Sequence, residues 1–405
     1  MKLKIYYTII LTLCASISMF AQGDWTIYNT DNSGLPYDDV YSTTSDQQGG
    51  IWVGTAYGLG YFDGENWMTF RTDNSGLPDN SIRALLLDKN GHLWIGTFLG
   101  GLVKYDGTNW TVYNISNSGL EDNFIRILVM DNEDILWIGT SGGLHSFDGS
   151  NWEIYNMNNS NLISNNIASL AIDSENTLWA GTINGGLARL KDDNISILSA
   201  DNTTLTDNTI LDIFIDEADN KWLACPAGGL NIFDNNNQHF YYINLNSDIC
   251  DNSINTIAQV HETTFLGMAA VGICTFGDWT NYNIDNSPLT TNTVRDITIQ
   301  QDSILWMSMD NGGLIKFIPD ITIANTPVSA LPNIRIFPNP ATEFIHIDTP
   351  LHTSVRLYDT SGRLLYSNEN VSITPTISVN KFPAGIYFLE LIFEEGRTTK
   401  KIVIK

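Results

Sequence analysis

Basic residues are scarce in this chain, which has 20 Lys and Arg against 45 Asp and Glu over 405 residues. The deficit falls on residues 23–332, which carry a formal net charge of −28, whereas residues 333–405 are nearly neutral. An acidic surface of this size repels phosphate backbones and anionic lipid headgroups. The composition therefore argues against nucleic-acid or membrane-surface binding. It suits divalent cations, neutral hydroxyl-rich ligands or a solvated acidic coat.

Long apolar stretches are also few. The longest, at residues 5–20, follows two lysines and gives way to polar sequence after Ala21. This is the pattern of a secretory signal peptide, so residues 1–21 are predicted to be removed on export. No later stretch is long enough to span a bilayer, and we expect an exported protein that is soluble or surface-attached, without a transmembrane segment.

Tryptophan, in contrast, is abundant and regularly spaced. All eleven tryptophans fall on two positions of a repeat of about 42 residues, which is present in seven copies. In the few repeats that lack tryptophan at one of these positions, Phe265, Ile195 or Phe240 replaces it. A period of roughly 40 to 50 residues with four short strands per copy is typical of a β-propeller, because one such sheet cannot bury both faces until its neighbours stack on it.

The copy at residues 81–113 shows the unit most clearly. It predicts four strands, here called A to D, at residues 82–87, 93–97, 102–105 and 110–113. Strands A and B are almost continuously apolar, so both of their faces must be covered. Gly96, on the same face of strand B as Trp94, leaves room for a bulky neighbour. The strand B tryptophans are therefore predicted to be wedges between adjacent sheets: Trp52, Trp94, Trp137, Trp179, Trp222 and Trp306.

The two ends of the repeat region complement each other. It opens with a lone strand D at residues 25–28, and its last copy has strands A to C, near residues 294–317, but no strand D. We therefore predict an all-β fold with a seven-bladed β-propeller over residues 23–318, in which the N-terminal strand closes the last blade.

A different pattern follows the repeats. Residues 319–332 are polar and proline-containing, as in a linker. Residues 333–405 then contain separate alternating strands, which predict a small antiparallel β-sandwich.

Four segments of this last region carry a family resemblance: residues 337–341, 357–363, 383–387 and 400–405. In order and spacing they resemble the type A C-terminal sorting domain of the type IX secretion system of Bacteroidota. The resemblance implies export by the type IX machinery, often with removal of the domain, and a secreted or outer-cell-surface location. The motif positions are Pro338, Asn339, Pro340, Gly362, Gly385, Tyr387, Lys400 and Lys401.

The repeats resemble the two-component regulator propeller family. Residues 93–102 and 136–144, with Leu-Trp-Ile-Gly-Thr followed by Gly-Gly-Leu, carry the resemblance. Copies five and six depart from it at residues 222–226 and 265–268, so their loops are expected to be the most specialised. Better-known relatives are sensor regions of membrane histidine kinases. This chain shows no kinase region or predicted span, so that role is not carried over.

Short polar residues recur in the loops from strand D to the next strand A, on the face that these loops share with the B-to-C loops. Two interpretations are open. The side chains either hydrogen-bond their own backbone to start strand A, or line a mouth that binds Ca²⁺ or a glycan. The residues are Asp38, Asp39, Asp79, Asn80, Asp122, Asn123, Asn165, Asn166, Asp207, Asn208, Asp251, Asn252 and Asn292.

Three of the four cysteines follow the signal peptide, and this odd number argues against disulfides as the main support of the fold. Cys225 and Cys250 are predicted on the same face of neighbouring blades, so a disulfide between them is one hypothesis. Unpaired buried thiols are the other. Cys274 has no obvious partner.

No catalytic set is evident, because the histidines are isolated and carboxylates are too abundant for any pair to be singled out. We therefore expect no enzyme and no cofactor apart from the Ca²⁺ considered above. The leading hypothesis is a secreted binding or adhesion module for a glycan or surface protein. The alternatives are a polysaccharide lyase or glycosidase on a propeller scaffold, and a purely structural surface component.

Overall fold

The computed structural model describes residues 23–46, 48–191, 194–235, 238–261, 263–319, 335–348, 353–359, 363–371, 376–393 and 396–405. The regular elements of these residues are all strands, which confirms the all-β prediction. No helix that is long and apolar enough to cross a membrane occurs among them. The predicted signal peptide and the predicted linker from residue 320 onward lie outside the described residues.

Between residues 23 and 319 the described strands form seven four-stranded antiparallel sheets. The first sheet is β2–β5 (Val40–Ser45, Ile51–Thr55, Gly58–Phe62, Trp67–Phe70) and the second is β6–β9 (Ile82–Leu87, Leu93–Thr97, Leu102–Tyr105, Trp110–Tyr113). The third is β10–β13 (Ile125–Met130, Leu136–Thr140, Leu144–Phe147, Trp152–Tyr155) and the fourth is β14–β17 (Ile167–Ile172, Leu178–Thr182, Leu187–Lys191, Asn194–Leu198). The fifth is β18–β21 (Asp212–Ile215, Lys221–Cys225, Gly229–Phe233, His239–Tyr242) and the sixth is β22–β25 (Ile254–Val260, Thr263–Met268, Ile273–Thr275, Asn281–Tyr282). The seventh joins β26 (Val294–Gln300), β27 (Ile304–Met309) and β28 (Leu314–Pro319) to β1 (Gly23–Tyr28).

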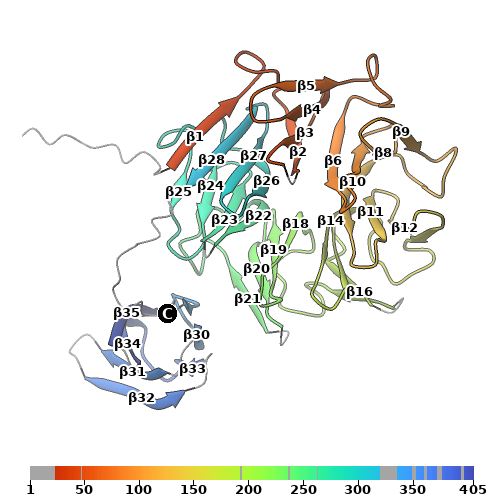
Figure 1. The fold of residues 1–405 in the computed structure, drawn as a ribbon. Helices are drawn as coiled ribbons and strands as arrows, with labels where there is room; N and C mark the ends of the chain where they lie inside the picture. Colours follow the sequence, from red (N-terminus) through yellow and green to blue (C-terminus); the bar gives the residue numbers. More distant parts are fainter. Residues whose placement is uncertain are drawn as a thin grey trace, which may run out of the picture.

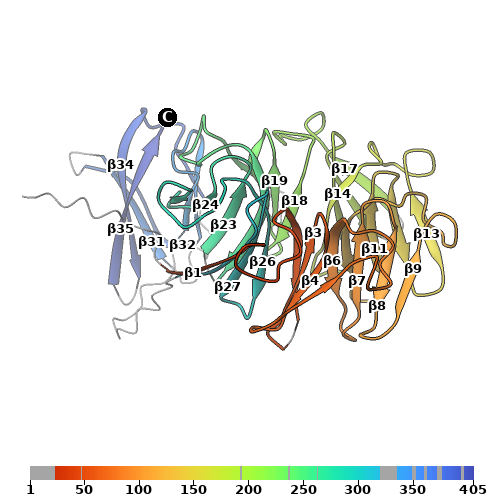
Figure 2. The ribbon, with the colours of Figure 1, turned by 90° about the horizontal axis from the view of Figure 1, so that it is seen from above.

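The sheets are arranged in a ring around their A strands. Each innermost strand contacts the innermost strand of the next sheet, from β2 through β6, β10, β14, β18 and β22 to β26. Strand β26 then contacts β2, so the circuit closes. Figure 1 shows these strands around the centre of the ring, and Figure 2 shows the ring from its side.

The seventh sheet is built from both ends of the repeat region, as predicted. Strand β1 pairs antiparallel with β28, from Gly23 opposite Pro319 to Tyr28 opposite Leu314. The ring of Trp25 stacks on that of Phe317, with centroids 3.9 Å apart. The first strand therefore covers the edge that β28 would otherwise expose.

The strand B tryptophans occupy the predicted wedge positions and also fasten the A-to-B turns. Trp137 Nε1 donates to Asp131 Oδ2 at 2.9 Å, while Asp131 Oδ1 accepts the backbone N–H of Glu133 and of Ile135. In the sixth sheet, where Phe265 replaces tryptophan, the position of the aspartate holds Val260. The same bond joins Trp94 to Asp88, Trp179 to Asp173 and Trp222 to Asp216, and Trp306 uses Gln300. Trp52 is partly buried and packs on Tyr61.

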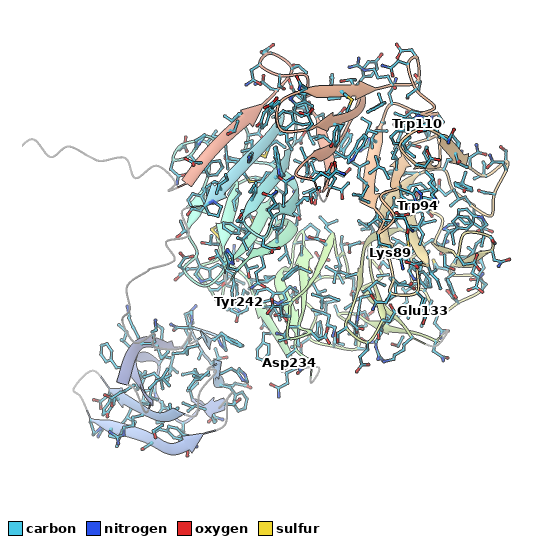
Figure 3. The ribbon with its side chains drawn as sticks, in the orientation of Figure 1. Lys89, Trp94, Trp110, Glu133, Asp234 and Tyr242 are labelled. Atoms are coloured by element: carbon cyan, nitrogen blue, oxygen red, sulfur yellow. A yellow bond between two sulfur atoms is a disulfide. The ribbon has the colours of Figure 1, made fainter. Side chains whose placement is uncertain are left out.

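Glycine on strand B allows adjacent sheets to approach. A Cβ at Gly96 would lie 2.6 Å from Cγ2 of Ile125 in the third sheet, which is closer than two carbons can pack. Figure 3 labels Trp94 on β7 and Trp110 on β9 of this second sheet. The expected space for a bulky neighbour beside Gly96 is therefore confirmed.

The C-terminal region forms two further sheets. One orders β29 (Arg335–Phe337), β30 (Phe344–Asp348) and β33 (Thr376–Ser378). The other orders β32 (Leu364–Val371), β31 (Thr353–Asp359), β34 (Gly385–Phe393) and β35 (Gly396–Ile404). Buried residues from both sheets, such as Ile345 and Leu389, form one apolar core. The short strand β33 was not predicted from the sequence.

The motif residues of this region hold its last strand. Asn339 Nδ2 donates to the carbonyl of Lys401 at 2.9 Å, and Asn339 Oδ1 accepts the N–H of Val403 at 2.8 Å. The hydroxyl of Tyr387 donates to the carbonyl of Pro383 at 2.6 Å. Of the other motif positions, Pro338 and Pro340 flank Asn339, Gly385 begins β34, Lys400 and Lys401 are exposed on β35, and Gly362 lies outside the described residues.

Candidate functional site

The D-to-A loops and the B-to-C loops share one face of the ring, here called the loop face. The D-to-A loops are the connections that precede β2, β6, β10, β14, β18, β22 and β26, and the B-to-C loops connect the second and third strands of each sheet. Hydrogen bonds join the two kinds of loop. The backbone N–H of Leu99 donates to Asp79 Oδ2 at 2.7 Å, and the hydroxyl of Ser141 donates to Asp122 Oδ2 at 2.6 Å.

The predicted Asp and Asn residues lie on this face with their oxygens engaged in their own loops. Asn123 Oδ1 accepts the backbone N–H of Ile115, eight residues earlier, at 3.0 Å. Asp122 Oδ1 accepts the N–H of Phe124 at 2.9 Å. The first bond recurs at Asp38, Asn80, Asn165, Asn208, Asn252 and Asn292, and the second at Asp79, Asp207 and Asp251. These contacts support the loop-folding interpretation.

Two of the predicted residues differ from this pattern. Asp39 accepts hydrogen bonds from the hydroxyl of Tyr41 at 2.8 Å and from the backbone N–H of Asn311 at 3.3 Å. Asn166 has a buried side-chain oxygen without a hydrogen-bond partner. Across the residues that the structure describes, no group of three or more His, Cys, Asp or Glu side chains could hold a metal ion.

The predicted pairing of Cys225 with Cys250 is wrong. Cys250 is bonded to Cys274, with Cα atoms 5.9 Å apart. Cys225 is a buried free thiol that accepts a hydrogen bond from Asn231 Nδ2 at 3.4 Å, and burial raises its thiol pKa.

The repeat itself explains the observed disulfide. A residue of the D-to-A loop, shortly before strand A, contacts a residue near the start of strand C of the same sheet. In the third sheet the N–H of Glu121 donates to His145 Nε2 at 3.2 Å, and in the fifth the hydroxyl of Thr206 donates to Asn231 Oδ1 at 2.9 Å. Cys250 and Cys274 occupy these two positions in the sixth sheet. The prediction considered only which face of the ring each cysteine lies on. An alignment of the seven copies that included this contact within one sheet would have identified Cys250 and Cys274 as the pair.

Reduction of this disulfide is expected to lower the free energy of unfolding by about 3 kcal/mol, because it releases a loop closed over 24 residues. Calorimetry of the secreted protein with and without reductant measures the loss, and intact mass after alkylation counts the thiols. Cys225→Ala is the control, since it should leave the response to reductant unchanged. Three alkylated thiols without prior reduction would contradict the pairing.

Exposed apolar side chains gather on the loop face. Of the eleven large hydrophobic residues that are exposed among the described residues of the ring, nine lie in D-to-A or B-to-C loops. The other two, Met68 and Tyr241, lie on the outer strands β5 and β21. Their concentration in the loops of one face makes the loop face the candidate interaction surface. The nine are Tyr37, Tyr57, Phe98, Leu99, Ile115, Met157, Ile163, Leu245 and Ile284.

A group of arginines and aromatic rings lies where the inner strands leave the loop face. The guanidinium carbon of Arg83 is 3.7 Å from the ring centroid of Tyr41 and 4.9 Å from that of Phe98. That of Arg126 is 4.4 Å from the centroid of Phe124. The rings of Phe98 and Phe124 meet edge to face at 4.8 Å. We call these five residues the arginine–aromatic cluster. Sequence reasoning missed them.

Neither arginine of the cluster forms an ion pair with the residues that the structure describes, unlike a third arginine beside them. Neighbouring Arg295 forms ion pairs with Asp39 at 3.0 Å and Asp310 at 2.8 Å. The Nε atoms of Arg83 and Arg126, in contrast, are buried and have no hydrogen-bond partner. Burial, followed by the positive charge of Arg83, lowers the pKa of Arg126, and the nearby carboxylate of Asp122 offsets part of this effect. The cluster therefore holds two like charges that act on each other, each with an Nε donor that makes no hydrogen bond.

Two aspartates on inner strands form bonds between neighbouring sheets. Asp212 Oδ2 accepts the N–H of Ile257 at 2.8 Å, and Asp296 Oδ2 accepts the N–H of Thr43 at 3.3 Å across the junction between the seventh and first sheets. Burial is the main cause that raises the pKa of both carboxyls, and that of Asp296 reaches about 7 with a further contribution from Asp212. Asp296 is the third residue of β26, and Asp212, the first residue of the shorter strand β18, aligns with it; the other copies have uncharged residues at this position.

The described histidines do not form a catalytic set. His92 contacts Asp88 in an A-to-B turn, on the face opposite the loop face. His145 is buried and accepts from a loop N–H, and burial lowers its pKa. Burial also lowers the pKa of His239 to about 4.

A hollow lies between the fifth sheet and the C-terminal region. The ring of Phe240 meets those of Phe337 at 5.5 Å and His346 at 4.7 Å. A cavity of about 480 Å³ beside them is also lined by Trp222 and Tyr242. Figure 3 labels Tyr242 and Asp234 on the side of the ring nearest this region.

Family models match both parts of the chain. The secretion system C-terminal sorting domain matches residues 335–405. The two component regulator propeller matches residues 34–57, 76–98, 119–142 and 161–184. The chain therefore carries regulator propeller repeats followed by a type IX sorting domain, as the sequence resemblances implied, and it is secreted or attached to the outer surface.

Comparison with curated proteins gives no match. Among solved structures, the chain is similar to the extracellular domain of BT3049 from B. thetaiotaomicron, assigned as a hybrid two-component system (20% identity, TM-score 0.64, 94% of this chain and 57% of that one). It is also similar to PorZ, a surface component of the type IX secretion system of Porphyromonas gingivalis (15% identity, TM-score 0.55, 92% of this chain and 60% of that one). A third is virginiamycin B lyase from Staphylococcus aureus (12% identity, TM-score 0.59, 73% of this chain and 99% of that one). The chain spans about three fifths of the length of the first two, and at these identities the likeness shows the fold alone.

Proposed function

We propose that this protein is a secreted or surface-held binding module that recognises a glycan or a surface protein with its loop face. The observation that carries the proposal is the gathering of exposed apolar side chains there, nine of eleven on the described ring. The arginine–aromatic cluster lies beside the same face and adds two positive charges that rest on aromatic rings. Apolar area together with a few directed polar groups is the composition of a recognition surface.

The C-to-D turns on the opposite face offer little for a ligand. They place aspartates where these side chains accept backbone N–H groups of the same turn. In the second sheet Asp106 Oδ1 accepts from Asn109 and Thr108, and these bonds hold the pKa of Asp106 at about 2. Asp63 and Asp148 repeat the arrangement. Among the described residues of these turns there is no exposed large hydrophobic side chain.

We expect Leu99→Asp combined with Ile115→Asp to weaken ligand binding about tenfold or more, because both side chains are well exposed and a charge there would be desolvated on contact. The wild-type protein is first screened on a glycan array and against outer-surface proteins, and affinity for the best target is then measured by calorimetry. Met68→Asp is the matched control, since Met68 is exposed on an outer strand. Equal loss in both variants would contradict binding by the loop face.

We further propose that binding proceeds without turnover. The support is the separation of the described histidines and the engagement of the loop carboxylates and amides in their own backbone. A reducing-sugar assay on polysaccharide mixtures tests this statement. Sugar release by the wild type, lost in the Leu99/Ile115 variant, would establish an enzyme in its place. An absence of any glycan or protein target in the screen would instead favour a structural component.

A further inference from the structure

We propose that the arginine–aromatic cluster is an anion-binding site and that it takes the carboxylate of an acidic sugar. This inference rests on the proposed function, because it names the ligand chemistry of the same face. The observations behind the inference concern Arg83 and Arg126, the two arginines of the cluster, and the aromatic rings against which they lie.

The repeat brings the two guanidinium groups together. Tyr41, Arg83 and Arg126 are the second residues of β2, β6 and β10, which are adjacent inner strands of the ring. The guanidinium carbons of Arg83 and Arg126 lie 6.0 Å and 4.4 Å from the same Phe124 ring centroid. A planar guanidinium that rests on a ring keeps its orientation, so little side-chain freedom is lost when its N–H groups meet a ligand.

The cluster has only partial counter-charge, because Asp122 raises the pKa of Arg126 by less than burial and Arg83 lower it. The chain has 45 acidic residues, and Arg295 nearby is paired with two of them. Among the described residues, however, neither Arg83 nor Arg126 forms an ion pair, and each has a buried Nε without a partner. Leaving such donors unused costs stability in the free protein. A bound carboxylate would compensate the two positive charges, because it can accept two parallel hydrogen bonds from the terminal nitrogens of a guanidinium that it faces.

The surroundings favour a sugar with no more than one charged group per ring. A sulfated or phosphorylated polyanion with several charges per residue would be repelled more strongly by the acidic surface, whose net charge across the chain is −25. The first sheet, which supplies Tyr41, also exposes Tyr37 and Tyr57 on the loop face, with ring centroids 6.4 Å apart. The C–H face of a sugar ring packs well on such rings, while its hydroxyls remain hydrated.

The test uses the full secreted chain and three probes of matched length: an oligogalacturonide, a neutral galactose oligomer and an oligoglutamate peptide. We expect the oligogalacturonide to bind and the other two to bind at least about tenfold more weakly. Arg83→Met and Arg126→Met, which keep most of the apolar stem, should each weaken its binding about tenfold or more, or about 1.4 kcal/mol. Arg189→Met is the matched control, because Arg189 lies over Trp179 on β16, away from the loop face.

The melting temperature is a second readout. If Arg126 only stabilised the fold, its replacement would lower the melting temperature, whereas a binding role predicts no such loss. Without ligand, Arg126→Met should melt at the same temperature as the wild type or above it, since it removes repulsion by Arg83. A lower melting temperature for Arg126→Met, preferred binding of the peptide, or no binding of the oligogalacturonide would each overturn the inference. If the double Arg83/Arg126 variant keeps full affinity for the screened target while the Leu99/Ile115 variant loses it, this inference fails and the proposed function stands.

Discussion

Deletion of residues 23–28 is expected to lower the melting temperature by about 10 °C or more. These residues form β1, which pairs along its whole length with β28. The deletion also removes Trp25 from its stack on Phe317, and Tyr28 from its contacts with Phe62 and Trp306. The seventh sheet would then expose an edge, and the chain would lose the contact that joins the two ends of the repeat region.

Differential scanning calorimetry of the secreted protein measures this effect. If the deletion prevents secretion, Trp25→Ala is a milder variant that can replace it. We expect Trp25→Ala to show a substantial part of the same decrease in melting temperature. Met68→Ala, which removes an exposed side chain from another outer strand, is the control and should change little. A melting temperature that is unchanged in both β1 variants would mean that this pairing does not hold the ring.

The strands of the repeat were predictable because the apolar pattern and the turn residues place the strand ends at the same positions. For the copy at residues 81–113 the four predicted ranges coincide with β6 to β9. The buried faces require apolar residues at fixed places, and the turn residues fix where each strand ends. The three-residue strand β33 has too few residues to show any period, and it forms only because β30 offers an edge to pair with.

The site was less predictable, because its residues are close in space and far apart in sequence. The loop Asp and Asn residues form an obvious series, and this regularity reflects the backbone bonds that each loop requires. Arg83 and Arg126 stand out only when the copies are aligned strand by strand, as charges at the second position of an otherwise apolar strand A. The disulfide between Cys250 and Cys274 likewise depends on a contact within one sheet.

Asp296 was not recognised from the sequence either, because its burial depends on residues of a neighbouring sheet. It accepts the N–H of Thr43 from the first sheet, so it contributes to the junction where the ring closes. Burial raises the pKa of Asp296 from 3.8 to about 7, and the nearby Asp212 carboxyl adds to the shift. In the folded protein this group therefore binds its proton up to near neutral pH, whereas in the unfolded chain it releases the proton near pH 4.

The sign of the pH dependence follows from this difference. Between about pH 4 and pH 7 the folded state holds a proton that the unfolded state has lost, so the contribution of Asp296 to stability falls as pH rises through this range. Above about pH 7 both states are ionised and the contribution is constant. The slope is at most about 1.4 kcal/mol per pH unit for one group. The loss over the whole range is then on the order of 2–4 kcal/mol.

Asp296→Asn should therefore be more stable than the wild type at pH 8, by roughly 2–4 kcal/mol, and about equally stable at pH 4. The amide cannot ionise, but its oxygen can still accept the N–H of Thr43. Chemical denaturation at several pH values gives the difference between the two proteins and cancels the groups that they share. Asp106→Asn is the control, because the low pKa of Asp106 predicts no gain at high pH. If Asp296→Asn were instead less stable than the wild type at pH 8, the junction would depend on an ionised carboxylate, and the raised pKa would be wrong.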